Sequence, residues 1–160
     1  MIRPVSLSDA QSICDIYNEY IKNSTITFEE IPVSVNDMST RIEATTQNYP
    51  WLVYEIDGKV VGYIYGRRWR ERAAYRTSIE AGIYLHPEFT RKGIGAELMK
   101  ELLKQLKEKS FHTVISGIAF PNPASIALCE KFGFKKVAHF AEVGYKFNKW
   151  IDVGYWQLIL

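Results

Sequence analysis

The sequence predicts a mixed α/β protein with a twisted central sheet flanked by helices. Segments rich in β-branched and aromatic residues alternate with segments whose apolar residues recur at helical spacing, in the order β-α-α-β-β-β-α-β-α-β-β. An Asp-Gly pair, which is typical of a tight hairpin turn, joins two of the predicted strands. Since 47% of the 160 residues are hydrophobic, we expect one domain over residues 1–160.

The N-terminal third is expected to contain one short strand and two helices. Residues 2–5 have an extended pattern. A helix to about residue 22 follows, because Ser8 and Gln11 form a capping-box pattern ahead of regularly spaced apolar residues. A second, shorter helix is predicted to begin at Ser34, which is a favourable N-cap residue.

The rest of the chain is expected to supply a hairpin and further strands and helices. Residues 51–56 and 59–65 form the hairpin around Asp57-Gly58, because these two residues tolerate the positive φ angles of a type I′ turn. The remaining elements are expected to be a strand over residues 78–85, a helix from about residue 93, a strand over 112–120, a helix from about 122 to Gly133, and two closing strands.

Charge and cysteine content exclude several classes of protein. The chain has 20 basic and 18 acidic residues and a formal charge of +2, so we expect no nucleic-acid partner and no membrane partner. No apolar run approaches the roughly 20 residues that a membrane span needs. Cys14 and Cys129 are too few for a disulfide framework, which favours a reducing, cytoplasmic location. The three histidines have no metal-site spacing, so no metal is expected.

A basic, glycine-containing stretch follows the strand that ends at Leu85. Helix starts present unpaired backbone N–H groups and a partial positive charge, so they bind anions. Gly93 and Gly95 allow a phosphate to approach the backbone, and Arg91 and Lys92 add charge. A Walker loop and a Rossmann fingerprint are both excluded by the residues that follow. From this stretch alone, glycines that only form a turn, with solvated cations, remain an alternative.

The window from Thr90 to Gly95 resembles the pyrophosphate-binding motif of the GNAT superfamily of N-acetyltransferases, with Thr90 where the family has Gln or Arg. The resemblance covers nearly the whole chain and is strongest to the branch that acetylates phosphinothricin and methionine sulfoximine. The further matching runs are Thr25-x-x-Phe28, Tyr49 to Val53, Tyr75 with Glu80, Pro121-Asn122, Gly144 to Lys146, Trp150, Asp152 to Gly154, and Trp156-Gln157.

The resemblance implies the GNAT fold, acetyl-CoA as co-substrate and a homodimer with acceptor sites near the subunit contact. It places the coenzyme in an opening between the strand of residues 83–85 and the strand that ends at Phe120. The residues that it implies for coenzyme binding are Ile83, Tyr84, Leu85, Arg91, Lys92, Gly93, Ile94, Gly95, Ala96 and Asn122.

Glu80 is the candidate catalytic base. Acetyl transfer to an amine requires the neutral amine, so a base or a water relay must accept a proton. The resemblance places the family glutamate at Glu80, and an ordinary solvated carboxylate is the alternative. Cys129 occupies the position where many relatives have a tyrosine acid. A small buried core residue is the plainer interpretation of Cys129, with Tyr145 or water as other proton donors.

Five arginines within residues 67–76 suggest how the acceptor binds. Guanidinium groups suit carboxylates and phosphinates, and the resemblance implies that this loop binds substrate, so we expect Arg70, Glu71 and Arg72 to bind the acceptor. The resemblance also implies acceptor contacts for Phe28 and Glu80. A solvated charged turn between two strands is the alternative, above all for Arg67 and Arg68.

The predicted function is acetylation of the amine of a small anionic amino-acid analogue by direct attack on acetyl-CoA. Phosphinothricin, methionine sulfoximine and methionine sulfone are acceptors of this type. The alternatives are an acetyltransferase for protein N-termini or polyamines, and a non-catalytic coenzyme A-binding domain.

Overall fold

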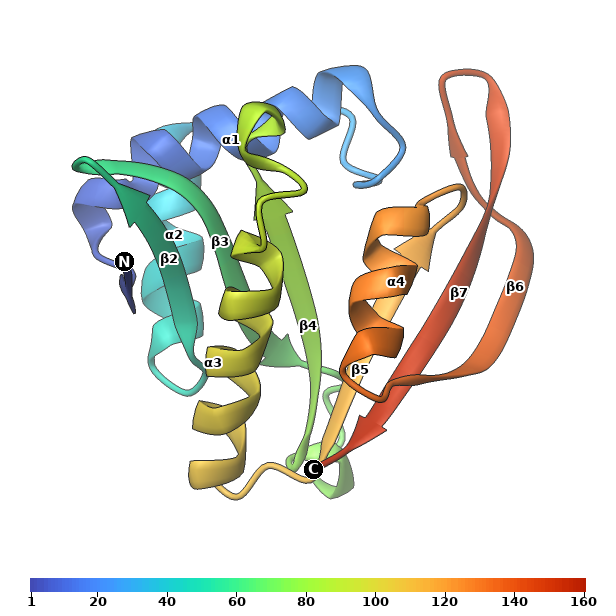
Figure 1. The fold of residues 1–160 in the computed structure, drawn as a ribbon. Coiled ribbons are helices and arrows are strands. Elements are labelled where there is room, and N and C mark those ends of the chain that lie inside the picture. The colour runs from blue at the N-terminus through green and yellow to red at the C-terminus, as the bar shows by residue number, and fades with distance from the viewer.

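A computed structural model describes all 160 residues. Its seven strands form one sheet in the order β1-β2-β3-β4-β5-β7-β6 (Figure 1). Only β4 and β5 run parallel to each other. The elements are β1 (Ile2–Pro4), α1 (Ala10–Asn23), α2 (Val35–Thr46), β2 (Trp51–Ile56), β3 (Lys59–Arg68), β4 (Ser78–Leu85), α3 (Ile94–Glu108), β5 (Thr113–Ala119), α4 (Pro123–Lys131), β6 (Lys135–Lys146) and β7 (Lys149–Ile159). The predicted order of elements is confirmed.

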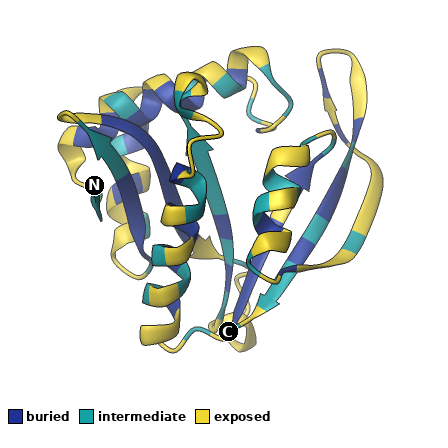
Figure 2. Ribbon diagram, in the orientation of Figure 1, coloured by how far each residue is buried: buried dark blue, intermediate teal, exposed yellow.

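Helices cover both faces of the sheet (Figures 1 and 2). Side chains alternate between the two faces along β2: Trp51 and Val53 join the core under α1 and α2, whereas Leu52 joins the core under α3 and α4. Both cores are closely filled with aliphatic and aromatic side chains. The longest helix, α3, has 15 residues, and no helix combines the length and the apolar character needed to span a bilayer.

β4 and β5 separate partway along their length. They pair only between residues 78–80 and residues 113–115. Beyond this point β4 stays paired to β3 as far as Leu85, and β5 stays paired to β7 as far as Ala119. The facing edges of β4 and β5 are therefore left without a strand partner, and the opening between them is visible in Figure 1. The opening that the family resemblance implied is confirmed.

Two local signals in the sequence act as predicted. Asp57 and Gly58 both have positive φ angles, 48° and 77°, in the turn between β2 and β3. Ser34 caps α2, because its Oγ accepts a hydrogen bond from the backbone N–H of Asp37 at 3.1 Å. These short-range interactions form within a few residues of the chain, which explains why the sequence alone reveals them.

The predicted cap of the first helix is wrong. A 3-10 turn precedes α1, and Ser6 and Asp9 form the capping pair: the backbone N–H of Ser6 donates to Oδ2 of Asp9 at 2.8 Å. Ser8 and Gln11 fit the same sequence pattern, but the Gln11 amide donates to a carboxylate one turn further along the helix. Asp9 prevails because it also accepts from Arg3, which fixes its side chain over the turn.

β3 is longer than predicted. Arg67 and Arg68 were expected in the connection after the strand, but they continue β3 and pair with Glu80 and Ile79 of β4. Alternation along the strand places Arg67 on the same face as Tyr65. The arginine pair therefore does not form a solvated turn, and one of its members points toward the cavity described below.

Candidate active site

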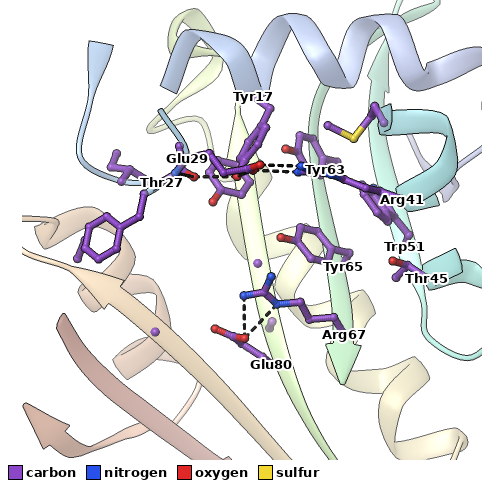
Figure 3. A pocket seen from close by; sticks show the side chains of 18 of the residues that line it. Tyr17, Thr27, Glu29, Arg41, Thr45, Trp51, Tyr63, Tyr65, Arg67 and Glu80 are labelled. Carbon is purple, nitrogen blue, oxygen red and sulfur yellow. Dashed lines mark hydrogen bonds and ion pairs between the residues drawn. The ribbon is translucent and has the colours of Figure 1, made fainter. Parts of the chain in front are cut away.

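A cavity of about 750 Å³ lies beside the point where β4 leaves β5. Its walls come from α1, α2, β3, β4, the start of β2, the end of β5, the middle of β7 and the segment of residues 26–29 (Figure 3). Most of the lining side chains are apolar or aromatic. The charged lining residues are Glu29, Arg41, Arg67 and Glu80. An apolar cavity with a few convergent charged groups is typical of a small-molecule site.

Glu80 and Arg67 face each other across β4 and β3, because the register of these strands places them directly opposite. Nη2 and Nε of Arg67 lie 2.8 and 3.0 Å from the same carboxylate oxygen, Oε2 of Glu80 (Figure 3). The Glu80 side chain is 21% exposed and that of Arg67 is 56% exposed. Glu80 is thus a largely covered carboxylate whose second oxygen, Oε1, accepts no hydrogen bond from the protein.

Arg41 and Glu29 form a second pair on another wall. Nη1 and Nη2 of Arg41 donate to Oε2 and Oε1 of Glu29 at 2.9 and 2.6 Å, so each oxygen has its own donor. The hydroxyl of Tyr17 also donates to Glu29 and lies 2.7 Å from Oγ1 of Thr27. The Arg41 hydrogen bonds hold the pKa of Glu29 below its ordinary value, and burial raises the pKa of Tyr17.

Aromatic rings form the wall between the two pairs. Tyr65 stacks on Trp51 with ring centroids 4.7 Å apart, and its own ring lies where a side chain on Gly82 would be: a Cβ there would fall 2.8 Å from the Tyr65 ring. Burial raises the pKa of the Tyr65 hydroxyl, so this phenol stays protonated at neutral pH. The indole N–H of Trp51 is buried and has no hydrogen-bond partner.

A second, smaller cavity fills the opening between the separated strands. Its lining includes Ile83 of β4, Ser116 of β5, and Asn122 and Cys129 at α4. The two cavities share wall residues on both strands, namely Ala81, Gly82, Tyr84, Gly117 and Ala119, together with Ile26. The two spaces therefore adjoin where β4 and β5 part, immediately beyond Glu80.

The predicted anion-binding stretch forms the start of α3. Gly93 is the N-cap residue, with φ of 84° in the left-handed region and no side-chain cap on the helix. The first backbone N–H groups of α3 are therefore free for an outside acceptor. Arg91 and Lys92 are exposed beside them, and Lys92 Nζ lies 4.6 Å from the centre of the Phe89 ring. Ile83, Tyr84 and Leu85 lie on the open part of β4, as predicted.

Asn122 and Cys129 at α4 each have a role in the structure of the protein itself. Oδ1 of Asn122 accepts from the backbone N–H of Ser125 at 3.2 Å, so Asn122 caps the helix. Cys129 is 2% exposed at the inner end of the smaller cavity, and burial raises the pKa of its thiol. Tyr145, the other side chain considered as a proton donor, is 53% exposed and lines neither cavity.

The predicted acceptor residues divide into two groups. Phe28 and Glu80 line the larger cavity. Arg70, Glu71 and Arg72 do not line it: the Arg70 guanidinium lies over the Trp69 ring, Glu71 pairs with Arg68 at 2.7 Å, and Arg72 begins a 3-10 turn. These three residues are exposed on the connection between β3 and β4.

Sequence reasoning missed Arg41 and Arg67. The strand alternation Tyr63, Tyr65, Arg67 could have placed Arg67 on the pocket face, had the strand been extended by two residues. No comparable signal marks Arg41 on α2. Its position becomes informative only when Glu29, 12 residues away in the chain, is found opposite it.

Comparison with known proteins agrees with this geometry. A family model described as an acetyltransferase (GNAT) domain matches residues 2–154. This chain belongs to the GNAT acetyltransferases. It is 36% identical over 156 residues to phosphinothricin N-acetyltransferase of Streptomyces viridochromogenes, covering 98% of this chain and 85% of that protein. It is 32% identical to the L-methionine sulfoximine/L-methionine sulfone acetyltransferase of Salmonella typhimurium, covering 99% and 94% of the two chains.

A solved structure extends the match to three dimensions. The phosphinothricin acetyltransferase of Sinorhizobium meliloti, determined in complex with acetyl-CoA, superposes with a TM-score of 0.97 at 36% identity, covering all of this GNAT acetyltransferase and 88% of that chain. The predicted fold and the predicted class of acetyl-CoA-dependent acetyltransferase are therefore confirmed. No group of three or more His, Cys, Asp or Glu side chains gathers in a metal-ligand arrangement.

Proposed function

We propose that this GNAT acetyltransferase transfers the acetyl group of acetyl-CoA to the amine of a small anionic amino-acid analogue. Phosphinothricin, methionine sulfoximine and methionine sulfone represent this class, and the names of two similar enzymes include them. The cavity beside Glu80 has a volume suited to a molecule of that size, and it holds two arginines. The amine attacks the thioester directly, without an acetyl-enzyme.

The observation that carries the proposal is the junction of the two cavities beyond Glu80. A bisubstrate enzyme must bring an amine and a thioester into contact while it shields them from water. The larger cavity provides space for the acceptor, and the opening between β4 and β5 provides space for the acetyl-bearing arm of the coenzyme. Their shared walls include Gly82 and Gly117, which have no side chains and let the rings of Tyr65 and Tyr155 pack against the two strands at this junction.

The residues around the opening fit acetyl-CoA. The unpaired edge of β4 offers backbone hydrogen-bonding groups, and the uncapped first turn of α3 suits the pyrophosphate, because free N–H groups and the helix dipole favour an anion there. We assign coenzyme binding to Ile83, Tyr84, Leu85, Arg91, Lys92, Gly93, Ile94, Gly95, Ala96 and Asn122. When bound, acetyl-CoA supplies the thioester carbonyl that the amine attacks.

Glu80 acts as the general base. Its Oε1 accepts no hydrogen bond from the protein, so it can accept the proton of the incoming ammonium through a water molecule. As the C–N bond forms, the C–S bond breaks and coenzyme A leaves as the thiolate. Phe28 forms part of the acceptor wall. Arg70, Glu71 and Arg72 stay candidates for acceptor binding, because their segment follows directly from Arg67, which lines the cavity.

A thiol-release assay tests the function. Acetyl-CoA is supplied with phosphinothricin, methionine sulfoximine, methionine sulfone, ordinary amino acids, spermidine or a Met-initiated peptide. We expect saturable release with the first three, and Glu80→Gln is expected to lower kcat by about 100-fold or more because the general base is lost. Glu108→Gln makes the same change at the exposed end of α3 and is the matched control. Its kcat is expected to equal that of wild type.

Each result has a distinct meaning. Unchanged kcat in Glu80→Gln contradicts the assignment of the base. Turnover confined to spermidine or the peptide keeps the coenzyme assignment and contradicts the acceptor class. Absence of thiol release with every amine contradicts the proposed reaction and favours a coenzyme-binding role.

We further propose that the protein is a cytoplasmic homodimer. Large apolar side chains are exposed along the hairpin of β6 and β7, namely Val137, Phe140, Val143, Tyr145, Phe147 and Trp150. Contiguous exposed apolar surface is characteristic of a protein interface. Both cysteines are free thiols, which suits a reducing compartment.

A further inference from the structure

We infer that Arg67 recognises the α-carboxylate of the acceptor, so that an α-amino-acid head group inserts between Arg67 and Glu80. The inference rests on the proposed function and deepens it, because it assigns the residue that binds the carboxylate which all three representative acceptors carry beside the amine. Arg67 is thereby a specificity-determining residue that neither the sequence motifs nor the comparisons identify.

The two arginines of the cavity, Arg41 and Arg67, differ in how many of their N–H donors are not used by the protein. Arg41 uses two nitrogens on two oxygens of Glu29, which completes a fork-shaped pair. Arg67 places Nε and Nη2 on one oxygen of Glu80, and its Nη1 has no hydrogen-bond partner in the protein. An incoming carboxylate therefore finds free N–H groups at Arg67, whereas at Arg41 it must first break a complete pair.

The charges of the Arg67 and Glu80 pair match those of an α-amino acid. The ammonium and carboxylate of such a molecule are separated by a single carbon, and the pair presents a carboxylate beside a guanidinium at 2.8 Å. The Arg67 and Glu80 pair involves a single carboxylate oxygen, and the two ion pairs with the ligand take its place. Charge-assisted hydrogen bonds to a planar guanidinium are stronger than neutral ones. The Arg67 side chain is 56% exposed and is free to adjust to the ligand.

The position of the pair also orients the acceptor. An amine held near Glu80, with the proton-relaying water between them, lies beside Ala81 and Gly117, where the two cavities adjoin. With the carboxylate at Arg67, the acceptor side chain extends past Tyr65 toward Trp51, which line the remaining length of the cavity (Figure 3). The tetrahedral end of the side chain then lies far from the reacting centre, and the head group alone determines where the amine sits.

Two acceptors that differ only in the carboxylate test the inference: methionine sulfone and 3-(methylsulfonyl)propan-1-amine. We expect Arg67→Gln to lower kcat/KM for methionine sulfone by about 10–100-fold, mainly through KM, because a charge-assisted hydrogen bond is lost. The change for the decarboxylated amine is expected to stay within about threefold, and KM for acetyl-CoA is expected to be unchanged. Arg67→Lys keeps the positive charge but lacks the planar guanidinium with its two parallel N–H donors. It is expected to recover part of the lost kcat/KM for methionine sulfone.

A control separates this role from effects on Glu80 or on folding. Arg76→Gln removes a charge from the same arginine-rich segment, but Arg76 lies outside both cavities. The kcat/KM of this variant is expected to equal that of wild type for both acceptors. Equal losses for both acceptors in Arg67→Gln, or no loss for either, overturn the inference while wild-type turnover still supports the proposed function. Wild-type enzyme that acetylates neither acceptor contradicts the proposed function itself. Thermal melting confirms that the variants are folded.

Discussion

At the residue scale, two arginine–glutamate pairs line one cavity, yet their hydrogen bonds make them chemically different. Arg41 and Glu29 satisfy each other, and Tyr17 adds a further donor, so this pair braces the segment of residues 26–29 against α2. Arg67 and Glu80 leave an oxygen and a nitrogen free. Residue type alone therefore does not separate a structural pair from a reactive one, whereas the number of unused donors and acceptors does.

A third pair, outside the cavity, makes stability depend on pH. Asp9 is almost fully covered and accepts from Nη1 and Nη2 of Arg3 at 2.8 and 2.9 Å. The Arg3 hydrogen bonds lower the pKa of Asp9 below its ordinary value. A lowered pKa in the folded state means that the stabilisation is present above the ordinary carboxyl pKa and is lost as the pH falls through the folded pKa.

We therefore expect Asp9→Asn to lower the free energy of unfolding at pH 7 by about 1–3 kcal/mol, because Arg3 loses one of its two carboxylate partners and keeps only Glu55. The difference from wild type is expected to shrink as the pH falls below about 4, where the aspartate of the unfolded chain binds a proton before folded Asp9 does. Urea unfolding at pH 7 and pH 3 measures both effects. Asp57→Asn, in the exposed hairpin turn, is the control. A difference that is the same at both pH values contradicts the assigned linkage.

At the scale of elements, β6 holds one wall of the larger cavity, the segment of residues 26–29, in place. Lys146 is buried at the end of β6, and its ammonium donates to the carbonyl oxygens of Ser24 and Thr27 at 2.8 and 2.9 Å. The Phe28 ring lies against Gly144, where a Cβ would fall 2.4 Å from it. The hairpin and the segment after α1 are thus one unit, although more than 100 residues of chain separate them.

The start of α3 supplies a prediction about coenzyme binding. Gly93→Ala places a Cβ at φ of 84°, where no neighbouring atom interferes, so the effect is backbone strain alone. We expect a loss of about 1 kcal/mol in stability and a rise of several-fold in KM for acetyl-CoA, because the first N–H groups of the helix shift. Steady-state kinetics and thermal unfolding measure these effects.

Gly58→Ala provides a matched control for that change. Gly58 has φ of 77° and is equally free of neighbours, but it lies in the turn between β2 and β3. It is expected to lose similar stability with an unchanged KM for acetyl-CoA. If both variants change KM alike, the effect comes from global stability and the assignment of the α3 start to the coenzyme is wrong.

At the scale of the whole molecule, the separation of β4 and β5 determines where the two cavities adjoin. Each strand keeps its other neighbour, so the sheet remains continuous on both sides of the opening. β6 is the edge strand of the sheet. The hairpin that it forms with β7 carries the exposed apolar side chains. An uncovered apolar edge favours association with another chain.

The proposed homodimer can be tested at this edge. Trp150 is 63% exposed, and Trp150→Glu places a charge in the apolar hairpin surface. We expect wild type to sediment as a dimer and Trp150→Glu to sediment as a monomer, because burial of an unpaired charge opposes association. Ile31→Glu, at an apolar side chain that is 81% exposed elsewhere, is the control and is expected to stay dimeric. A monomeric wild type contradicts the proposal.

The candidate site was predictable only where local pattern carried the information. Gly93 and the strand of Glu80 could be placed from the sequence, because helix starts and strands are encoded within a few residues. The exposed positions of Arg70, Glu71 and Arg72 could not be foreseen, because a charged run has the same appearance whether it faces a cavity or solvent.

The sequence by itself determined the order of strands and helices, the hairpin turn, the cap of α2 at Ser34 and, through its resemblance to known motifs, the family. Only the tertiary structure decided that Arg67 belongs to the site, since strand register brings it opposite Glu80, 13 residues away in the chain. It also decided that two cavities adjoin beyond that pair. Contacts between distant segments depend on register and packing, and no local pattern specifies them.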